Sequence, residues 1–302
     1  RYISLKLIEK GHQSKKHLNH LILDYFNNNN YPSKDKIFIN ALVLGSVRMR
    51  GKSNYIVEKI YKGDFSKLKL KIKDILSMAI YQIDYMDSVP DYAALSSSVD
   101  ITKKLLPGLD KLVNAVLRKY LSQKEIFKPQ KNNPDTYQLL SHPKWLIDRW
   151  TNNYGITQTF KICSFNNAPQ KVWFRANYNI PMKDLEEEIE FLELSPSYHK
   201  MNNNFFYVSN SFKLISSRLF KEGYISIQNP INGFIVELLK PDNSDDIIDG
   251  CSSPGGKGSL ISALAPKSNI ISIENNQKRV KKIEDTIKCQ KISFLKKRVL
   301  SL

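Results

Sequence analysis

A short apolar segment followed at once by a glycine-rich turn constrains the fold of this 302-residue chain more than any other feature. Two isoleucines precede Asp249, and a turn that contains four glycines then runs to Gly258. The pattern after the turn predicts a helix, a strand that ends at Glu274 and a charged helix. This order is typical of the first half of a doubly wound nucleotide-binding α/β fold. The expected ranges are 259–265, 270–274 and 275–288.

The ligand of such a turn is indicated by the spacing of its glycines and by Glu274. Glycines directly after a strand let the backbone approach a ligand, and a carboxylate at the end of the next strand can accept hydrogen bonds from ribose hydroxyls. A P-loop would need glycine at Cys251 and serine or threonine at Gly258, and the dinucleotide fingerprint needs another glycine spacing. S-adenosylmethionine, which carries a ribose but no phosphate, remains as the ligand. An ordinary glycine–proline turn without a ligand is the alternative.

The residues of the turn also carry a family resemblance. Residues 249–257, D-G-C-S-S-P-G-G-K, resemble a motif of the RNA cytosine-5 methyltransferases of the Sun/NOP family. Upstream, residues 223–229 are similar to that family's G-x-x-x-x-Q-D segment, and residues 175–177 to the R-x-N of its small middle module. Asn229 and Gly258 stand where the family more often has Asp and Thr.

Residues 1–130 have apolar side chains at helical spacing, with glycines between the periodic runs, and therefore predict an all-helical bundle. The bundle contains 23 basic and 12 acidic side chains. The whole chain contains 46 basic and 29 acidic side chains, so its formal net charge is +17. Residues 35–48, 81–83 and 113–118 make it similar to an RNA-binding domain of the NusB type. The basic charge of such a domain favours an RNA partner, whereas codon bias toward lysine is the alternative explanation.

Three domains are expected. Residues 1–130 form the all-α NusB-like bundle, residues 131–216 a small α+β module, and residues 217–302 an incomplete α/β, Rossmann-like methyltransferase domain that depends on S-adenosylmethionine. In the middle module we expect a helix over 143–154 with Trp145 facing inward. This domain order resembles that of the bacterial RsmB (Fmu/Sun) type of small-subunit rRNA methyltransferases.

The resemblance implies a cofactor, a substrate and a set of site residues. The cofactor is S-adenosylmethionine, and the substrate is small-subunit (16S) rRNA, methylated at carbon 5 of a cytosine. Glu274 would bind the ribose, where the family more often has Asp. Arg48, Arg50 and Arg118 are candidates for contacts with RNA phosphates, with a solvated surface or an internal salt bridge as the alternative. The cofactor loop would consist of Cys251, Ser252, Ser253, Pro254, Gly255, Gly256 and Lys257.

The cysteines that the family's reaction needs are not found at the family's positions. That reaction implies a thiolate that adds to carbon 6 of cytosine and a second cysteine that assists release, both downstream of the cofactor loop. Of the three cysteines here, Cys163 has apolar neighbours, Cys251 lies in the loop, and Cys289 has no motif around it. We therefore expect a truncated chain that has no catalytic residue and is inactive as given, with the nucleophilic cysteine beyond Leu302.

Two other functions stay open. A NusB-like RNA-binding protein, acting for example in transcription antitermination, would explain the basic bundle but would not need the glycine-rich turn. A non-functional remnant would explain the missing cysteines. Because no apolar run approaches the length of a membrane span and no signal-peptide pattern is present, we expect a cytoplasmic protein without a membrane partner. We also expect a monomer with no DNA partner and no metal site.

Overall fold

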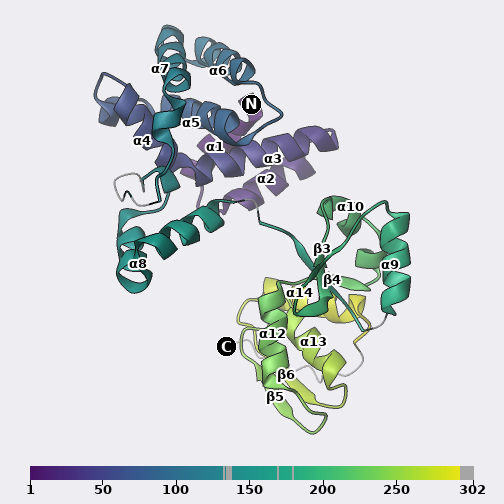
Figure 1. Cartoon of the computed structure of the whole chain (residues 1–302). Coiled ribbons are helices and arrows are strands. Elements are labelled where there is room, and N and C mark those ends of the chain that lie inside the picture. Colours follow the sequence, from purple (N-terminus) through teal and green to yellow (C-terminus); the bar gives the residue numbers. More distant parts are fainter. Residues whose placement is uncertain (132, 134–137, 169, 179, 293–302) are drawn as a thin grey trace. The chain divides into compact units, whose positions relative to one another are not determined.

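The computed structural model groups the chain into two compact units, Arg1–Pro169 and Gln170–Leu302. Figure 1 shows a first unit made of helices and a second unit that contains all the labelled strands. The division of the chain at residues 130 and 216 stays a prediction. The structure describes residues 1–131, 133, 138–168, 170–178 and 180–292.

The first unit is a helical bundle whose central element is α5. Because its apolar residues recur every three or four positions, Ile72, Leu76 and Ile80 lie on one side and are buried. Helices α1, α3, α4, α6 and α7 all contact α5, which confirms the predicted all-α bundle. The helices are α1 (Tyr2–Gln13), α2 (Leu18–Asn27), α3 (Ser33–Arg48), α4 (Arg50–Ile60), α5 (Leu70–Tyr85), α6 (Asp91–Leu105), α7 (Asp110–Ser122) and α8 (Lys144–Asn167), with short 3₁₀ helices at Phe65–Lys67 and Lys124–Phe127.

Helix α8 differs from the expectation at its N-terminal end. Trp145, expected to face inward, is 65% exposed, whereas Ile147 and Cys163 are buried in a small cluster with Leu140. Residues two positions apart lie on nearly opposite sides of a helix, so the burial of Ile147 directs Trp145 toward solvent. Gly155 interrupts the helix with φ 77° and ψ 163°, a conformation that glycine adopts without side-chain clash.

The first part of the second unit is an antiparallel sheet of four strands in the order β2-β3-β1-β4. Its elements are β1 (Trp173–Ala176), α9 (Met182–Phe191), β2 (Ser197–His199), β3 (Asn202–Tyr207), α10 (Ser211–Ile215), α11 (Arg218–Lys221) and β4 (Ile225–Ile227). Helix α9 buries Leu185 and Ile189 in one cluster with Phe174 and Phe206 of the sheet. The small α+β module is confirmed. Strand β4 lies within residues 217–302, the range expected for the third domain, but it pairs with β1 and completes the sheet of the module.

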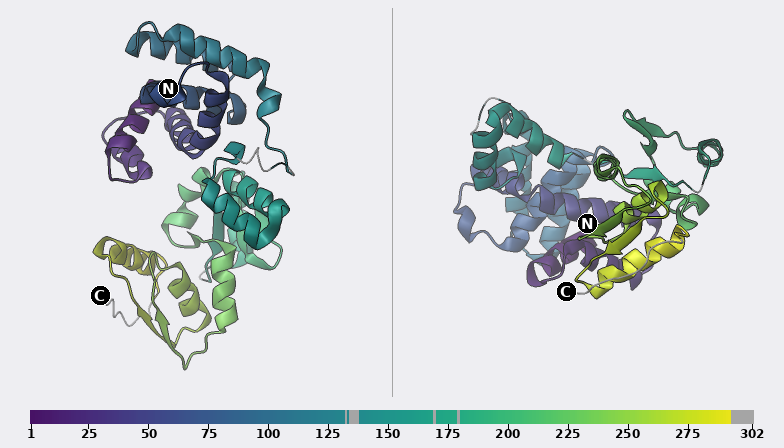
Figure 2. Two further views of the ribbon diagram at one scale, coloured as in Figure 1. Left: turned by 90° about the vertical axis from the view of Figure 1, so that its left-hand side faces the viewer. Right: turned by 90° about the horizontal axis from the view of Figure 1, so that it is seen from below.

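The second part of this unit contains a parallel strand pair connected by a helix. Its elements are α12 (Pro230–Leu239), β5 (Asp246–Asp249), α13 (Gly256–Leu264), β6 (Asn269–Ser272) and α14 (Gln277–Cys289). Strands β5 and β6 lie side by side in Figure 1 and in the left view of Figure 2, with Asp249 opposite Ser272. Val236 of α12 and Leu260 of α13 pack against Ile270 of β6.

This order of strand, turn, helix, strand and helix confirms the predicted α/β pattern. The apolar residues at 292–295 also allow a further strand, which lies, apart from Ile292, outside the described residues. None of the helices in the described part of the chain has an apolar stretch of the length that a bilayer span requires.

Candidate functional site

The predicted cofactor loop connects β5 to α13 at the carboxyl ends of the two parallel strands. Ligands bind outside these strand ends in open α/β sheets. Gly255 has φ +102°, in the left-handed region that glycine tolerates best. A Cβ atom added at Gly250 would meet nothing within 4 Å, so the backbone beside it borders open space. The sequence therefore places its glycines where the chain turns and where a ligand can approach.

Hydrogen bonds on the inner side of the loop hold it against β6 and α14. The Ser252 hydroxyl donates to the Ser272 hydroxyl at 2.9 Å, and the Ser252 amide donates to the carbonyl of Ile273 at 3.2 Å. On the α14 side, the Thr286 hydroxyl donates to the carbonyl of Pro254 at 2.7 Å. Ser253 donates to the carbonyl of Arg279 at 3.1 Å. The serines of the motif therefore fix the shape of the loop, and the exposed Cys251 does not take part in these bonds.

Two buried carboxylates lie where the neighbouring strands finish: Asp249 is the last residue of β5, and Glu274 follows the last residue of β6 by two positions. Asp249 is 7% exposed, and its Oδ2 atom has no hydrogen-bond partner; Lys257 Nζ lies 3.9 Å from Oδ1. Glu274 is 5% exposed, accepts a hydrogen bond from the Asn276 amide at 3.2 Å and lies 3.8 Å from Arg279 Nη1. The structure thus brings Glu274, as predicted, and Asp249, which was not among the predicted site residues, to the same edge of the sheet.

Arg175 of β1 connects the antiparallel sheet to the loop. Its Nη1 atom donates to the carbonyl of Gly256 at 3.1 Å and to Gln228 Oε1 at 2.7 Å. Its Nη2 atom donates to the Ser259 hydroxyl at 2.9 Å, and both Nε and Nη2 donate to Asn177 Oδ1. The R-x-N motif, quoted above only for its resemblance, therefore holds the first turn of α13 in place.

The guanidinium of Arg175 is buried without a carboxylate partner. Arg175 is 1% exposed, and every acceptor that bonds to it among the described residues is a neutral amide, carbonyl or hydroxyl oxygen. Burial lowers the pKa of Arg175 to about 10, because a charged group loses its hydration in the interior. The positive charge at this position is therefore satisfied by hydrogen bonds but not balanced.

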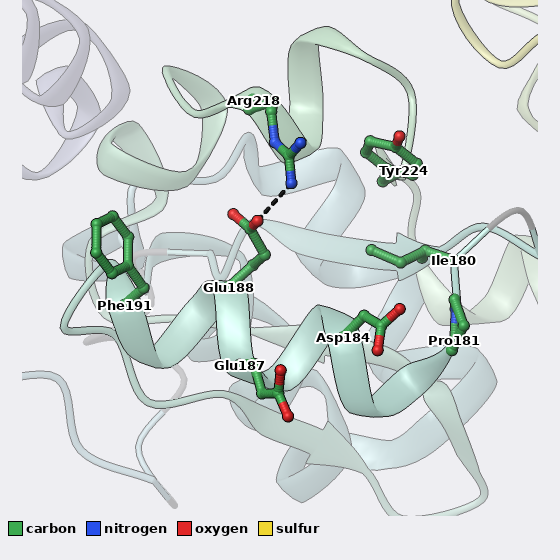
Figure 3. Close-up of a pocket in the computed structure, with 8 residues that line it drawn as sticks. All are labelled: Ile180, Pro181, Asp184, Glu187, Glu188, Phe191, Arg218 and Tyr224. Atoms are coloured by element: carbon green, nitrogen blue, oxygen red, sulfur yellow. Dashed lines mark hydrogen bonds and ion pairs between the residues drawn. The ribbon is translucent and has the colours of Figure 1, made fainter.

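A pocket of about 670 Å³ lies elsewhere, on the antiparallel sheet module. Figure 3 shows Asp184, Glu187 and Glu188 along α9, with Glu188 in an ion pair with Arg218. None of the predicted cofactor-loop residues is among its lining residues. Because three carboxylates outnumber the one guanidinium here, this pocket does not suit RNA phosphates.

The three cysteines lie in different surroundings. Cys163 is fully buried in α8, and burial raises the pKa of its thiol. Cys289 is half-buried, and its thiol contacts the carbonyl of Lys221 at 3.4 Å. Cys251 is exposed in the loop. No group of His, Cys, Asp and Glu among the described residues could hold a metal ion.

The arginines predicted to contact RNA differ in what they bind. Arg50 forms an internal salt bridge, which was the expected alternative to RNA contact: its Nη2 atom lies 3.0 Å from the buried carboxylate of Asp74. Arg48 and Arg118 are exposed, and Arg118 donates to Asn114 on its own helix at 3.2 Å. RNA contact by any of the three stays a prediction.

Three family models match the chain in the order of its domains. The NusB family matches residues 1–122, and the ferredoxin-like domain of the Methyltr_RsmF/B-like family matches residues 142–183. The model of the 16S rRNA methyltransferase RsmB/F matches residues 236–299, which include the loop and Glu274.

Relatives with curated names align with most of the chain. The probable ribosomal RNA small subunit methyltransferase B of Bacillus subtilis (strain 168) is 26% identical over 296 residues, covering 94% of this chain and 64% of the relative. The ribosomal RNA small subunit methyltransferase B of Proteus mirabilis (strain HI4320) is also 26% identical, over 85% of this chain and 61% of the relative. The chain thus spans less than two thirds of the length of these relatives.

Solved structures share the fold. The crystal structure of PH0851 matches with a TM-score of 0.68 at 17% identity, covering 98% of this chain and 68% of that one. A methyltransferase homolog protein from Pyrococcus horikoshii matches with a TM-score of 0.51 at 20% identity, covering 56% and 57%. At such identities the likeness concerns the fold alone. The chain therefore contains a NusB domain followed by ferredoxin-like and methyltransferase domains of the type found in the 16S rRNA methyltransferases RsmB and RsmF.

Proposed function

We propose that this chain binds S-adenosylmethionine at the loop 249–257 and small-subunit rRNA at its NusB domain, for methylation of carbon 5 of a cytosine. The observation that carries the proposal is the pair of buried carboxylates, Asp249 and Glu274, at the ends of adjacent parallel strands beside an open stretch of backbone. The choice of cytosine carbon 5 rests on the resemblance of the loop to the Sun/NOP motif.

The residues present fit this cofactor. Glu274 offers carboxylate oxygens to the ribose hydroxyls, as an acid at this position does in dinucleotide-binding folds. The unpartnered Asp249 Oδ2 is a buried acceptor, and an ammonium group such as that of the methionine part would satisfy it. Two carboxylates favour a ligand that is cationic and has no phosphate. When bound, the cofactor supplies an electrophilic methyl group on its sulfonium.

The protein side of this chemistry also needs a thiolate nucleophile. We assign that role to none of the three cysteines. Cys163 is fully buried in the first unit, Cys289 contacts backbone carbonyls through its thiol, and Cys251 belongs to the loop that would hold the cofactor. What we propose for this chain's own residues is therefore cofactor binding and RNA binding, in the cytoplasm and as a monomer.

Cofactor binding can be measured directly on the full chain with S-adenosylhomocysteine, which has the ribose and the amino acid part but no transferable methyl group. We expect Glu274→Gln to weaken binding about tenfold or more in isothermal titration, since a charge-assisted hydrogen bond is lost. The matched control is Glu284→Gln, the same change at an exposed position of α14, which should alter the affinity for S-adenosylhomocysteine by less than about twofold.

The same titration separates this proposal from a binding module without a cofactor. If the wild type does not bind S-adenosylhomocysteine, or if Glu274→Gln binds as well as the wild type, the cofactor site is wrong. A chain that then still binds structured rRNA with a steep salt dependence would favour the NusB-like binding module.

A further inference from the structure

A second cavity, of about 390 Å³, lies along α13 toward its C-terminal end. Residues from three segments line it: Arg175 and Tyr178 from β1 and the chain after it, Ser262 and Pro266 from α13 and the chain after it, and Lys291 after α14. The predicted loop residues 251–257 do not line this cavity. It is therefore a different place from the proposed cofactor site.

The first observation at this cavity is the unbalanced charge of Arg175. A buried charge costs free energy unless an opposite charge balances it. The hydrogen-bond partners of Arg175 are neutral, and no carboxylate lines the cavity among the described residues. An anion in the cavity would supply the missing opposite charge.

The second observation is a buried hydroxyl without a partner. Ser262 is 7% exposed and lines the cavity, and its Oγ atom forms no hydrogen bond. Buried hydroxyls are normally hydrogen-bonded, so an unpartnered one at a cavity wall indicates a missing ligand. Lys291, which is exposed, adds a second cation at the same cavity.

We propose that this cavity binds a phosphate group. Lys291 and the Ser262 hydroxyl are the direct donors, since the N–H groups of Arg175 already donate to neutral oxygens and Arg175 acts through its charge. Lysine and serine are common ligands of phosphate oxygens. The volume accommodates a phosphate together with part of the molecule that carries it. The proposal does not rest on cofactor binding.

The test uses inorganic phosphate and the full chain, with phosphate replacing chloride at constant ionic strength. We expect saturable binding in isothermal titration and a matching rise in melting temperature. Lys291→Glu should weaken binding about tenfold or more, because it reverses a charge at the site, and Ser262→Ala should weaken it severalfold.

The matched control is Lys288→Glu, the same change at an exposed lysine one helical turn earlier that does not line the cavity. It should alter binding by less than about twofold. Binding that is not saturable, or that Lys288→Glu weakens as much as Lys291→Glu does, would overturn the proposal. Because Ser262→Ala removes a single unpaired oxygen, it keeps the test open if a charge reversal disturbs folding.

Two further competitors identify the source of the phosphate. Uridylyl-uridine carries one phosphodiester, like an RNA backbone, and uridine 5′-monophosphate carries a phosphomonoester. Displacement of inorganic phosphate by the dinucleotide assigns the site to the RNA backbone. Displacement by the mononucleotide alone assigns it to a free phosphomonoester, and both results support a phosphate site.

Discussion

Replacement of Arg175 by methionine tests how strongly one buried guanidinium stabilises the second unit. Methionine keeps an unbranched side chain but has no charge and no donors. In the wild type, Arg175 donates hydrogen bonds of 3.1 Å or less to Asn177, Gln228, Gly256 and Ser259. These bonds connect the antiparallel sheet to the first turn of α13, so their loss should lower the free energy of unfolding of the unit.

The magnitude follows from what each acceptor retains. Asn177 Oδ1 still accepts from the Ser226 hydroxyl at 2.9 Å, and the Gly256 carbonyl still accepts from the Ser259 hydroxyl at 3.0 Å. Gln228 Oε1 loses the hydrogen bond that Arg175 donates to it, and the Nε2 donor of the same amide has no acceptor even in the wild type. Each lost bond costs about 1 kcal/mol and an orphaned acceptor ~1–3 kcal/mol, while removal of the buried charge returns part of this. We expect a net loss of about 2–4 kcal/mol.

Urea denaturation followed by tryptophan fluorescence can measure this loss of stability in the second compact unit of the chain. With Trp145 and Trp150 replaced by phenylalanine, the remaining tryptophan is Trp173, two residues from Arg175 in β1. The control is Arg218→Met, the same change at an exposed arginine, which should cost less than about 1 kcal/mol. If both variants lose the same free energy, or if Arg175→Met stays within about 0.5 kcal/mol of the wild type, the reasoning is refuted.

Three further predictions concern separate elements. Gly255→Ala should cost ~1–3 kcal/mol of stability in urea denaturation because of its positive φ, whereas Gly256→Ala should be nearly neutral; equal effects would contradict this. Burial and the Asp84 carboxylate raise the pKa of Tyr120 in the folded chain. As the pH rises, the unfolded chain therefore loses the Tyr120 proton before the folded chain does. The contribution of this hydroxyl to stability is present below about pH 10 and falls above it. Tyr120→Phe should therefore cost ~1–3 kcal/mol at pH 8 and progressively less above pH 10, and a constant cost up to pH 11 would argue against this. Arg118→Gln should lower the affinity for rRNA, and it should reduce the steepness of the plot of log binding constant against log salt concentration by about 1. If filter binding gives an unchanged slope, Arg118 does not contact an RNA phosphate.

The helices and strands around the loop could be predicted because their signals are local. Apolar spacing marks a helix or a strand within a few residues, and glycine marks the turn at Gly255, whose positive φ other residues rarely adopt. The same local rules predicted the helical bundle of the first unit and the β5–α13–β6 order of the second. At the start of α8 they did not determine which side is buried, because Trp145, Leu146 and Ile147 are consecutive apolar residues, and Trp145 was predicted on the wrong side.

The sequence by itself determined the order of the domains, the loop 249–257 and the acid at Glu274, since each depends on neighbours within one segment. The partners of Arg175 were decided by the tertiary structure, because Gly256 and Ser259 are 81 and 84 residues away along the chain. Burial likewise decided that the oxygen of Asp249 has no partner and that Arg50 forms an ion pair inside the bundle. The partners of a buried charge or polar atom come from segments that are distant in the sequence, so a local sequence pattern cannot predict them.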